Sequence, residues 1–121
     1  MFSEWSERWG RDAAGMLLAQ HPEVDAIACG SDQIARGVLD TLRDLGRQVP
    51  DDVAVIGYDN WEVLTTNARP ELTSIDANLQ QLGREAALRL FNAMDSDRPR
   101  PSGVEHLPVR LVIRGSTIAH R

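Results

Sequence analysis

Three short segments of the sequence place a carboxylate beside a hydroxyl or amide side chain. The pairs are Ser31 with Asp32, Asp59 with Asn60, and Asp76 with Asn78. Such groups accept and donate several hydrogen bonds at once, which suits a polar ligand rich in hydroxyl groups. A single pair would carry little information, because each can also cap a helix or a turn. The three pairs favour a polar-ligand site if the fold brings them together.

Each pair directly follows a short apolar run that predicts a β-strand. The predicted strands cover residues 25–29, 53–58, 72–75 and 109–116. The run over 53–58 is almost continuously apolar, as expected for a strand covered on both faces. Apolar residues recur every three or four positions in the predicted helices, which cover residues 5–20, 32–45 and 78–94. Residues 59–71 look irregular, with room for a helical turn, and residues 95–103 form a proline-rich turn or linker.

Strands that alternate with helices predict an α/β fold with a parallel sheet flanked by helices and joined by right-handed crossovers. In such sheets, ligands bind at the carboxyl ends of the strands. The three polar pairs are therefore expected to meet at one edge of the sheet. Simpler roles stay open: Ser31 or Asp32 could be a helix N-cap, and Asp59 and Asp76 could cap short helices or turns.

Composition narrows the possible functions. The chain has 121 residues, of which 42% are hydrophobic, and this is enough for one core. Its net charge of −5 argues against a nucleic-acid surface. All 13 basic residues are arginine. The lack of lysine excludes a phosphate-binding loop of the GxxxxGK type, a Schiff-base enzyme and a protein kinase.

No arrangement of side chains predicts catalysis, a metal or a cofactor. Asp51, Asp52 and Asp59 could suggest a phospho-acceptor pocket, but such a pocket uses a lysine, and the first two precede their strand. The three histidines are scattered without metal-binding spacing. Cys29 lies in an apolar run, so we expect a small core residue and not a nucleophile. The charged start has no signal peptide and no run could span a membrane, so we expect a cytoplasmic protein that is not an enzyme.

The chain resembles the carboxyl-terminal part of LacI/GalR-type transcriptional regulators from about Trp5 to Thr117. The motifs that carry the resemblance are "GSDQ" at a helix start, "VPDDVAVIGYD", "PELTSI", "LGR" and the closing "RGST". The effector-binding core of this family resembles periplasmic sugar-binding proteins and has two α/β lobes. The resemblance implies that residues 1–121 are one fragment, the carboxyl-terminal lobe of a type I periplasmic-binding-protein-like fold.

The resemblance also implies a function. A small effector, expected to be a carbohydrate, binds between the lobes and changes DNA affinity allosterically. DNA contact would occur only through the amino-terminal helix-turn-helix, which has no counterpart here, and the regulator would be a homodimer. The alternative is a fragment of a periplasmic-type solute-binding protein of a transport system, which would carry an export signal in place of the helix-turn-helix.

The effector-binding residues expected from the resemblance and from the strand ends are Trp5, Trp9, Ser31, Asp32, Asp59 and Asp76. Asp59 matches the family's acid that hydrogen-bonds sugar hydroxyls. Trp5 matches a loop position where an aromatic ring stacks on a sugar face. Ser31 stands where the family usually has asparagine, and its reach is shorter. Trp9 could instead pack at the helix start.

The helix at 78–94 has an apolar stripe that, in the family, packs on the other lobe. The stripe contains Leu79, Leu82, Ala86, Leu90 and Met94. Exposing such side chains costs about 1.5–3 kcal/mol for each large one. We therefore expect this helix to fold back onto its own lobe or to pair with a second copy of the chain.

Overall fold

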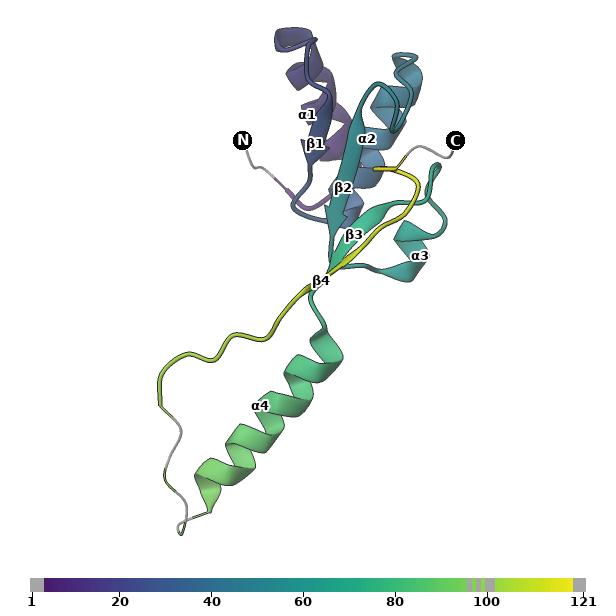
Figure 1. The fold of residues 1–121 in the computed structure, drawn as a ribbon. Coiled ribbons are helices and arrows are strands. Elements are labelled where there is room, and N and C mark those ends of the chain that lie inside the picture. The colour runs from purple at the N-terminus through teal and green to yellow at the C-terminus, as the bar shows by residue number, and fades with distance from the viewer. Residues whose placement is uncertain (1–3, 96, 98, 100–101, 119–121) are drawn as a thin grey trace.

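The computed structural model describes residues 4–95, 97, 99 and 102–118. Eight elements follow one another along the chain (Figure 1): α1 (Glu7–Gln20), β1 (Ala26–Ala28), α2 (Asp32–Asp44), β2 (Ala54–Tyr58), α3 (Glu62–Thr65), β3 (Thr73–Asp76), α4 (Leu79–Met94) and β4 (Arg110–Val112). Each predicted helix and strand is present, and the segment predicted to be irregular contains the one-turn helix α3.

The four strands form one sheet in the order β1-β2-β3-β4. The first three are parallel, as predicted. The expectation of a wholly parallel sheet is wrong for β4, which pairs antiparallel with β3 and is shorter than the predicted strand over 109–116. The chain leaves the sheet at the carboxyl end of β3 and returns at the same end, where Arg110 lies opposite Asp76. A strand that enters there must run against its neighbour.

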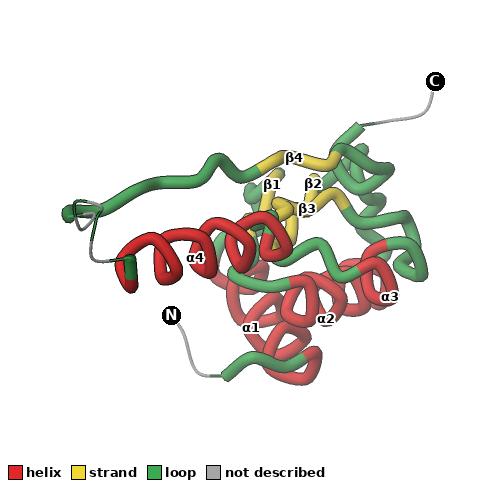
Figure 2. Tube along the Cα trace, turned by 90° about the horizontal axis from the view of Figure 1, so that it is seen from below, coloured by secondary structure: helices red, strands yellow, loops and turns green. Residues whose placement is uncertain are grey.

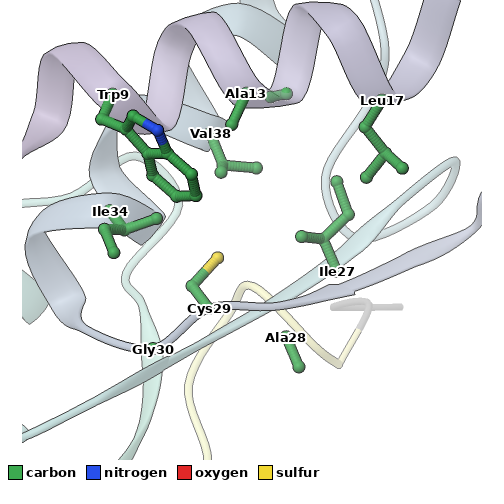
Figure 3. Close-up of a pocket in the computed structure, with 10 residues that line it drawn as sticks. Trp9, Ala13, Leu17, Ile27, Ala28, Cys29, Gly30, Ile34 and Val38 are labelled. Atoms are coloured by element: carbon green, nitrogen blue, oxygen red, sulfur yellow. The ribbon is translucent and has the colours of Figure 1, made fainter. Parts of the chain in front are cut away.

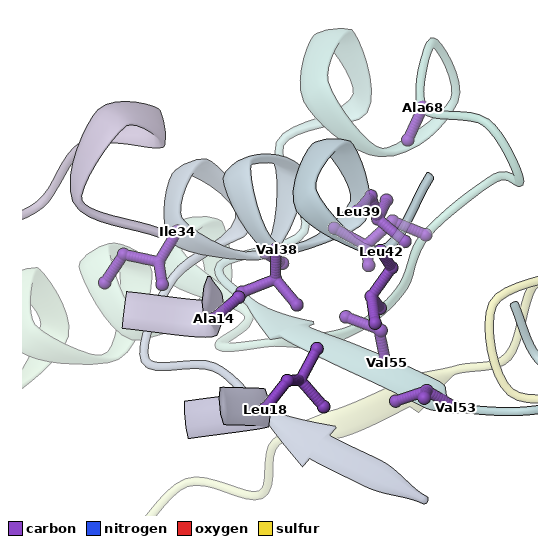
Figure 4. Packing of buried hydrophobic residues seen from close by; sticks show 11 residues of the cluster. Ala14, Leu18, Ile34, Val38, Leu39, Leu42, Val53, Val55 and Ala68 are labelled. Atoms are coloured by element: carbon purple, nitrogen blue, oxygen red, sulfur yellow. The ribbon is translucent and has the colours of Figure 1, made fainter. Parts of the chain in front are cut away.

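The hydrophobic core lies between one face of the sheet and the helices α1 and α2 (Figures 2 and 4). Its buried residues are Ala14, Leu18, Ile34, Ala35, Val38, Leu39, Leu42, Val53, Val55, Ala68 and Leu72. The two helices approach closely at glycines: a Cβ on Gly37 would overlap the Glu7 carbonyl oxygen, and one on Gly10 would overlap that of Ile34. The two glycines therefore allow the backbones of α1 and α2 to pack in close contact.

The opposite face of the sheet is more open. Residues of β2 alternate between buried and half-buried, with Val55 toward the core and Ile56 away from it. Leu111 of β4 is 53% exposed and lies opposite Ile75. The expectation that β2 is covered on both faces is therefore wrong within the described part of the chain, where helices cover one face.

Helix α4 extends away from the rest of the fold (Figure 1) and buries none of its residues. Leu90, Phe91 and Met94 are 61%, 66% and 71% exposed. The expectation that α4 folds back onto its own lobe is wrong, because the turn after β3 directs the helix outward. An Arg89–Glu105 ion pair of 3.0 Å links α4 to the returning segment. Pairing of α4 with a second copy stays a prediction.

None of the helices in the described residues is long and apolar enough to span a membrane.

Candidate ligand-binding rim

The carboxyl ends of β1, β2 and β3 meet at one edge of the sheet, which we call the rim. Hydrogen bonds cross between the segments that follow these strands. The Trp61 backbone N–H donates to Asp32 Oδ2 at 2.8 Å, and Asn60 Nδ2 donates to Asp76 Oδ2 at 3.2 Å. The prediction that the three polar pairs come together is therefore confirmed by their contacts.

Ser31 is the N-cap of α2. Its Oγ accepts a hydrogen bond from the Ile34 backbone N–H at 3.2 Å, which satisfies one of the free donors of the first turn. The residue is 4% exposed. Of the two roles that the sequence left open for Ser31, the structure shows the capping role.

Asp32 is buried beneath the rim, with 1% of its surface exposed. Its Oδ1 accepts from Ser74 Oγ at 2.6 Å and its Oδ2 from the Trp61 N–H. A Cβ on Gly57 would overlap Oδ1, so glycine at that position makes room for the carboxylate. Asp32 thus fixes the segment between β2 and α3, and both of its oxygens are already engaged.

Asp59 is the half-buried acid at the end of β2. Its backbone N–H donates to Ile75 O at 2.9 Å, and its φ of 106° lies in a region that residues with a Cβ rarely adopt. It is not the cap of α3, because Trp61 holds that position. Burial raises the pKa of the Asp59 carboxyl, and the negative charge of Asp32 raises it further. A ligand that donates hydrogen bonds would relieve this cost of ionisation.

Asp76 is the last residue of β3 and sits in a different environment. Its Oδ1 accepts from the Asn78 backbone N–H at 2.8 Å, while Asn60 and Arg110 donate to Oδ2. The Asn78 N–H bond lowers the pKa of Asp76 most, followed by the Asn60 bond, and Arg110 contributes as well. The rim therefore contains one acid that resists ionisation and one that favours it.

Trp5 lies at the same end of the molecule as the rim. Helices α1 and α2 run in the same direction, since Glu7 pairs with Arg36 and Arg11 pairs with Asp40, each at 3.3 Å. The first turns of both helices therefore share one end, and Trp5, just before α1, is 55% exposed there.

Trp9 packs against the core instead. It lines an apolar cavity of about 360 Å³ between α1 and β1, together with Ile34 and Cys29 (Figure 3). Burial raises the pKa of the Cys29 thiol to about 12, and the charge of Asp32 adds to the effect. Cys29 is therefore a protonated packing residue. Among the described residues, no group of three or more His, Cys, Asp or Glu could hold a metal ion.

The sequence interpretation missed two side chains that hold the rim together. Ser74 Oγ accepts from the Asn60 backbone N–H at 3.0 Å while donating to Asp32. Arg114 donates from Nη2 to Asn60 Oδ1 and from Nη1 to Leu72 O, both at 2.8 Å. Both residues stand inside the motifs "PELTSI" and "RGST", so the signal was present, but their partners are far away in sequence.

Residues 2–117 match the family of periplasmic binding protein-like domains. Among curated proteins, the chain is 40% identical over 97 residues to the HTH-type transcriptional regulator CelR of Thermobifida fusca. The match covers 80% of this chain and 26% of CelR. The chain therefore spans about a quarter of the length of this relative.

Two solved structures extend the similarity to three dimensions. A LacI family transcriptional regulator from Arthrobacter sp. FB24, in complex with lactose, has a TM-score of 0.84 and 35% identity over 96% of this chain and 44% of that one. The CelR–cellobiose complex has a TM-score of 0.81 and 33% identity over 94% of this chain and 34% of that one.

Proposed function

Because this chain belongs to the family of periplasmic binding protein-like domains, and its relatives are LacI-family transcriptional regulators, we propose that it is the carboxyl-terminal lobe of a regulator's effector-binding core. The short span of the match, 26% of CelR, supports a fragment of a longer protein. The relatives' role as regulators also supports a binding function in place of catalysis.

We propose that the ligand is a carbohydrate and that Asp59 is its main polar contact. The observation that carries this proposal is the half-buried Asp59 carboxyl, held at a strand end in an unfavourable backbone conformation. Sugar hydroxyls would donate to this carboxylate, while the exposed Trp5 indole would cover an apolar sugar face. The complexes of similar proteins with cellobiose and lactose support the same ligand class.

The other expected contacts divide into two groups. Ser31 and Asp32 are buried and already bonded, so we assign them to support of the rim. Asp76 keeps 29% of its side chain exposed and could contact a ligand at the edge of the site. Trp9 packs against the core, and we assign it no contact with ligand.

The rim forms one side of a cleft in this proposal. The apolar stripe of α4 would pack on the other lobe, and ligand between the lobes would favour one lobe arrangement. That change would alter the DNA affinity of an amino-terminal segment in a homodimer, and DNA would alter ligand affinity by the same factor. With half of the contacts, the 121-residue chain should bind ligand weakly.

The test is an NMR titration of the chain with cellobiose, lactose and their constituent monosaccharides. We expect weak binding, with the largest shifts at the amides of residues 59–61 and the Trp5 indole, and loss of these shifts in Asp59→Ala. Asp25→Ala, an exposed acid just before the amino end of β1, is the matched control and should bind as the wild type does. Shifts centred on the cavity beside Trp9 would contradict the assignment of the site. Micromolar affinity of the isolated chain would contradict the proposal that the rim forms only one side of the cleft.

A further inference from the structure

Asn60 occupies the centre of the polar network at the rim. Its backbone N–H donates to Ser74 Oγ at 3.0 Å and its Nδ2 donates to Asp76 Oδ2 at 3.2 Å. Its Oδ1 accepts from Arg114 Nη2 at 2.8 Å. One side chain therefore joins the loop after β2 to the end of β3 and to the segment after β4.

The loop that carries Asn60 is held in an unfavourable conformation. Asp59 and Asn60 are consecutive residues with a Cβ and with φ values of 106° and 59°. Such conformations persist only where the surroundings fix them, and they concentrate at functional sites. Here the backbone N–H groups of Asn60 and Trp61 are fixed by Ser74 and by Asp32, respectively. The side chain of Asn60 adds the third attachment.

Asp76 lies where the chain leaves the sheet and where it returns. Its Oδ1 accepts from the N–H of Asn78, which immediately precedes α4, and its Oδ2 accepts from Arg110, the first residue of β4. Figure 1 shows that α4 and the returning segment both extend from this end of the sheet. A change in Asp76 therefore affects both the start of α4 and the point where the returning segment enters β4.

Arg114 provides the fixed end of the network. Its Nη1 donates to Leu72 O at 2.8 Å, and its backbone N–H donates to Thr73 Oγ1 at 2.8 Å. Thr73 is 1% exposed, so this anchor belongs to the packed part of the sheet. Asn60 thus lies between Arg114, which is held by the packed part of the sheet, and the residues that begin α4.

We propose that Asn60 is a positioning residue that couples the Asp59 loop to the base of α4 through Asp76. Asn60 sets the position of Asp59 for ligand, and a change in the loop reaches Asn78 and Arg110 through the Asn60–Asp76 bond. The role in ligand sensing rests on the proposed function, whereas the coupling itself is a property of the chain. Because coupling is reciprocal, a change at the base of α4 also alters the Asp59 loop.

The first experiment measures the coupling without ligand. The carboxyl pKa of Asp76 and the exchange rate of the Asn78 amide with water are followed by NMR in the wild type, Asn60→Gly and Asn60→Asp. Glycine adopts the left-handed backbone freely, so Asn60→Gly removes the side chain without adding strain. Asn60→Asp keeps the acceptor for Arg114 but places a carboxylate against Asp76.

We expect the pKa of Asp76 to rise in Asn60→Gly and to rise further in Asn60→Asp, and the Asn78 amide to exchange several-fold faster in both. Asn67→Gly is the matched control, because Asn67 Nδ2 donates to Val63 O at 2.9 Å, four residues away in the segment around α3. It should leave both measurements unchanged. An unchanged Asp76 pKa together with unchanged Asn78 exchange in both Asn60 variants would overturn the proposal.

The second experiment adds lactose or cellobiose and compares the response of Asn78 in the wild type and in Asn60→Gly. We expect a sugar-induced shift of the Asn78 amide in the wild type and its loss in the variant. An equal shift in both chains would overturn the coupling role of Asn60. If no sugar shifts any rim amide while the Asn60 variants still alter Asp76, the carbohydrate function fails and the coupling stands.

Discussion

Helices α2 and α4 are similar in length and both carry apolar side chains at helical spacing, yet their surroundings are opposite. Helix α2 buries seven of its residues, and α4 buries none. Ser31 caps the first turn of α2, whereas Asn78 precedes α4 in a left-handed conformation without a side-chain cap bond. The difference shows that the described part of the chain buries the apolar side of α2 and leaves the apolar side chains of α4 exposed.

The largest test of this comparison is a matched pair of leucine truncations. Leu42 of α2 is fully buried and Leu90 of α4 is 61% exposed. Leu42→Ala should lower the free energy of unfolding by about 2–5 kcal/mol, because it leaves a cavity in the core. Leu90→Ala should change it by less than about 0.5 kcal/mol, as for other surface sites. Urea unfolding at low protein concentration measures both, and equal losses would mean that α4 is packed in solution.

A second pair of variants replaces one glycine in each helix by alanine. A Cβ on Gly37 of α2 would overlap the Glu7 carbonyl oxygen, whereas the space around Gly83 of α4 is open. Gly37→Ala should therefore cost about 1–3 kcal/mol through overpacking of α1 against α2. Gly83→Ala should stabilise the helical state of α4 by up to about 1 kcal/mol and raise the helical signal in circular dichroism. A loss of helicity in Gly83→Ala would contradict an open α4.

Substitutions at the residues that begin α2 and α4 should give a smaller difference in stability. Ser31→Ala removes the Oγ that accepts a hydrogen bond from the Ile34 backbone N–H and should cost about 1 kcal/mol. Asn78→Gly should cost less, because glycine adopts the left-handed conformation at φ 56° freely and the lost side-chain bond to Gln81 is exposed. Urea midpoints of the two variants compare the effects, and a larger loss in Asn78→Gly would show that α4 is tied to the folded core.

Much of α2 and of the rim was predictable from the sequence because the signals are local. Ser31 was predicted as a possible helix N-cap and is one, and Gly46, just after the helix end, has a positive φ of 72° that favours glycine. The meeting of the three strand ends followed from parallel topology. These predictions depend on neighbours in sequence or on a general rule of sheets.

The rest depends on contacts that no local pattern specifies. The bond between Asp32 and Ser74 joins residues 42 positions apart, and that between Asn60 and Arg114 spans 54 positions. The direction of β4 depends on which end of the sheet the chain returns to after α4. The apolar stripe of α4 has the same spacing as that of a buried helix, so periodicity predicts the helix but not what covers it.

The two acids of the rim give the smallest effects, with opposite signs. The pKa of Asp59 is raised, so its contribution to stability is complete below the unfolded pKa and is lost as pH rises through the folded value. The pKa of Asp76 is lowered, so its contribution is present above the unfolded pKa and is lost as pH falls through the folded value. At neutral pH, ionised Asp59 therefore destabilises the fold and ionised Asp76 stabilises it.

Asp59→Asn should accordingly raise the urea midpoint slightly at neutral pH, and Asp76→Asn should lower it. Both differences should shrink in acid, and urea unfolding between about pH 3 and pH 8 would show them. The same sign for both variants would contradict the contrast between the two environments. If Asp59→Asn raises the urea midpoint at neutral pH, the Asp59 carboxylate does not stabilise the folded sheet. If Asp59→Asn is also the variant that loses the sugar-induced shifts, the stability cost of Asp59 is explained by the ligand that it binds.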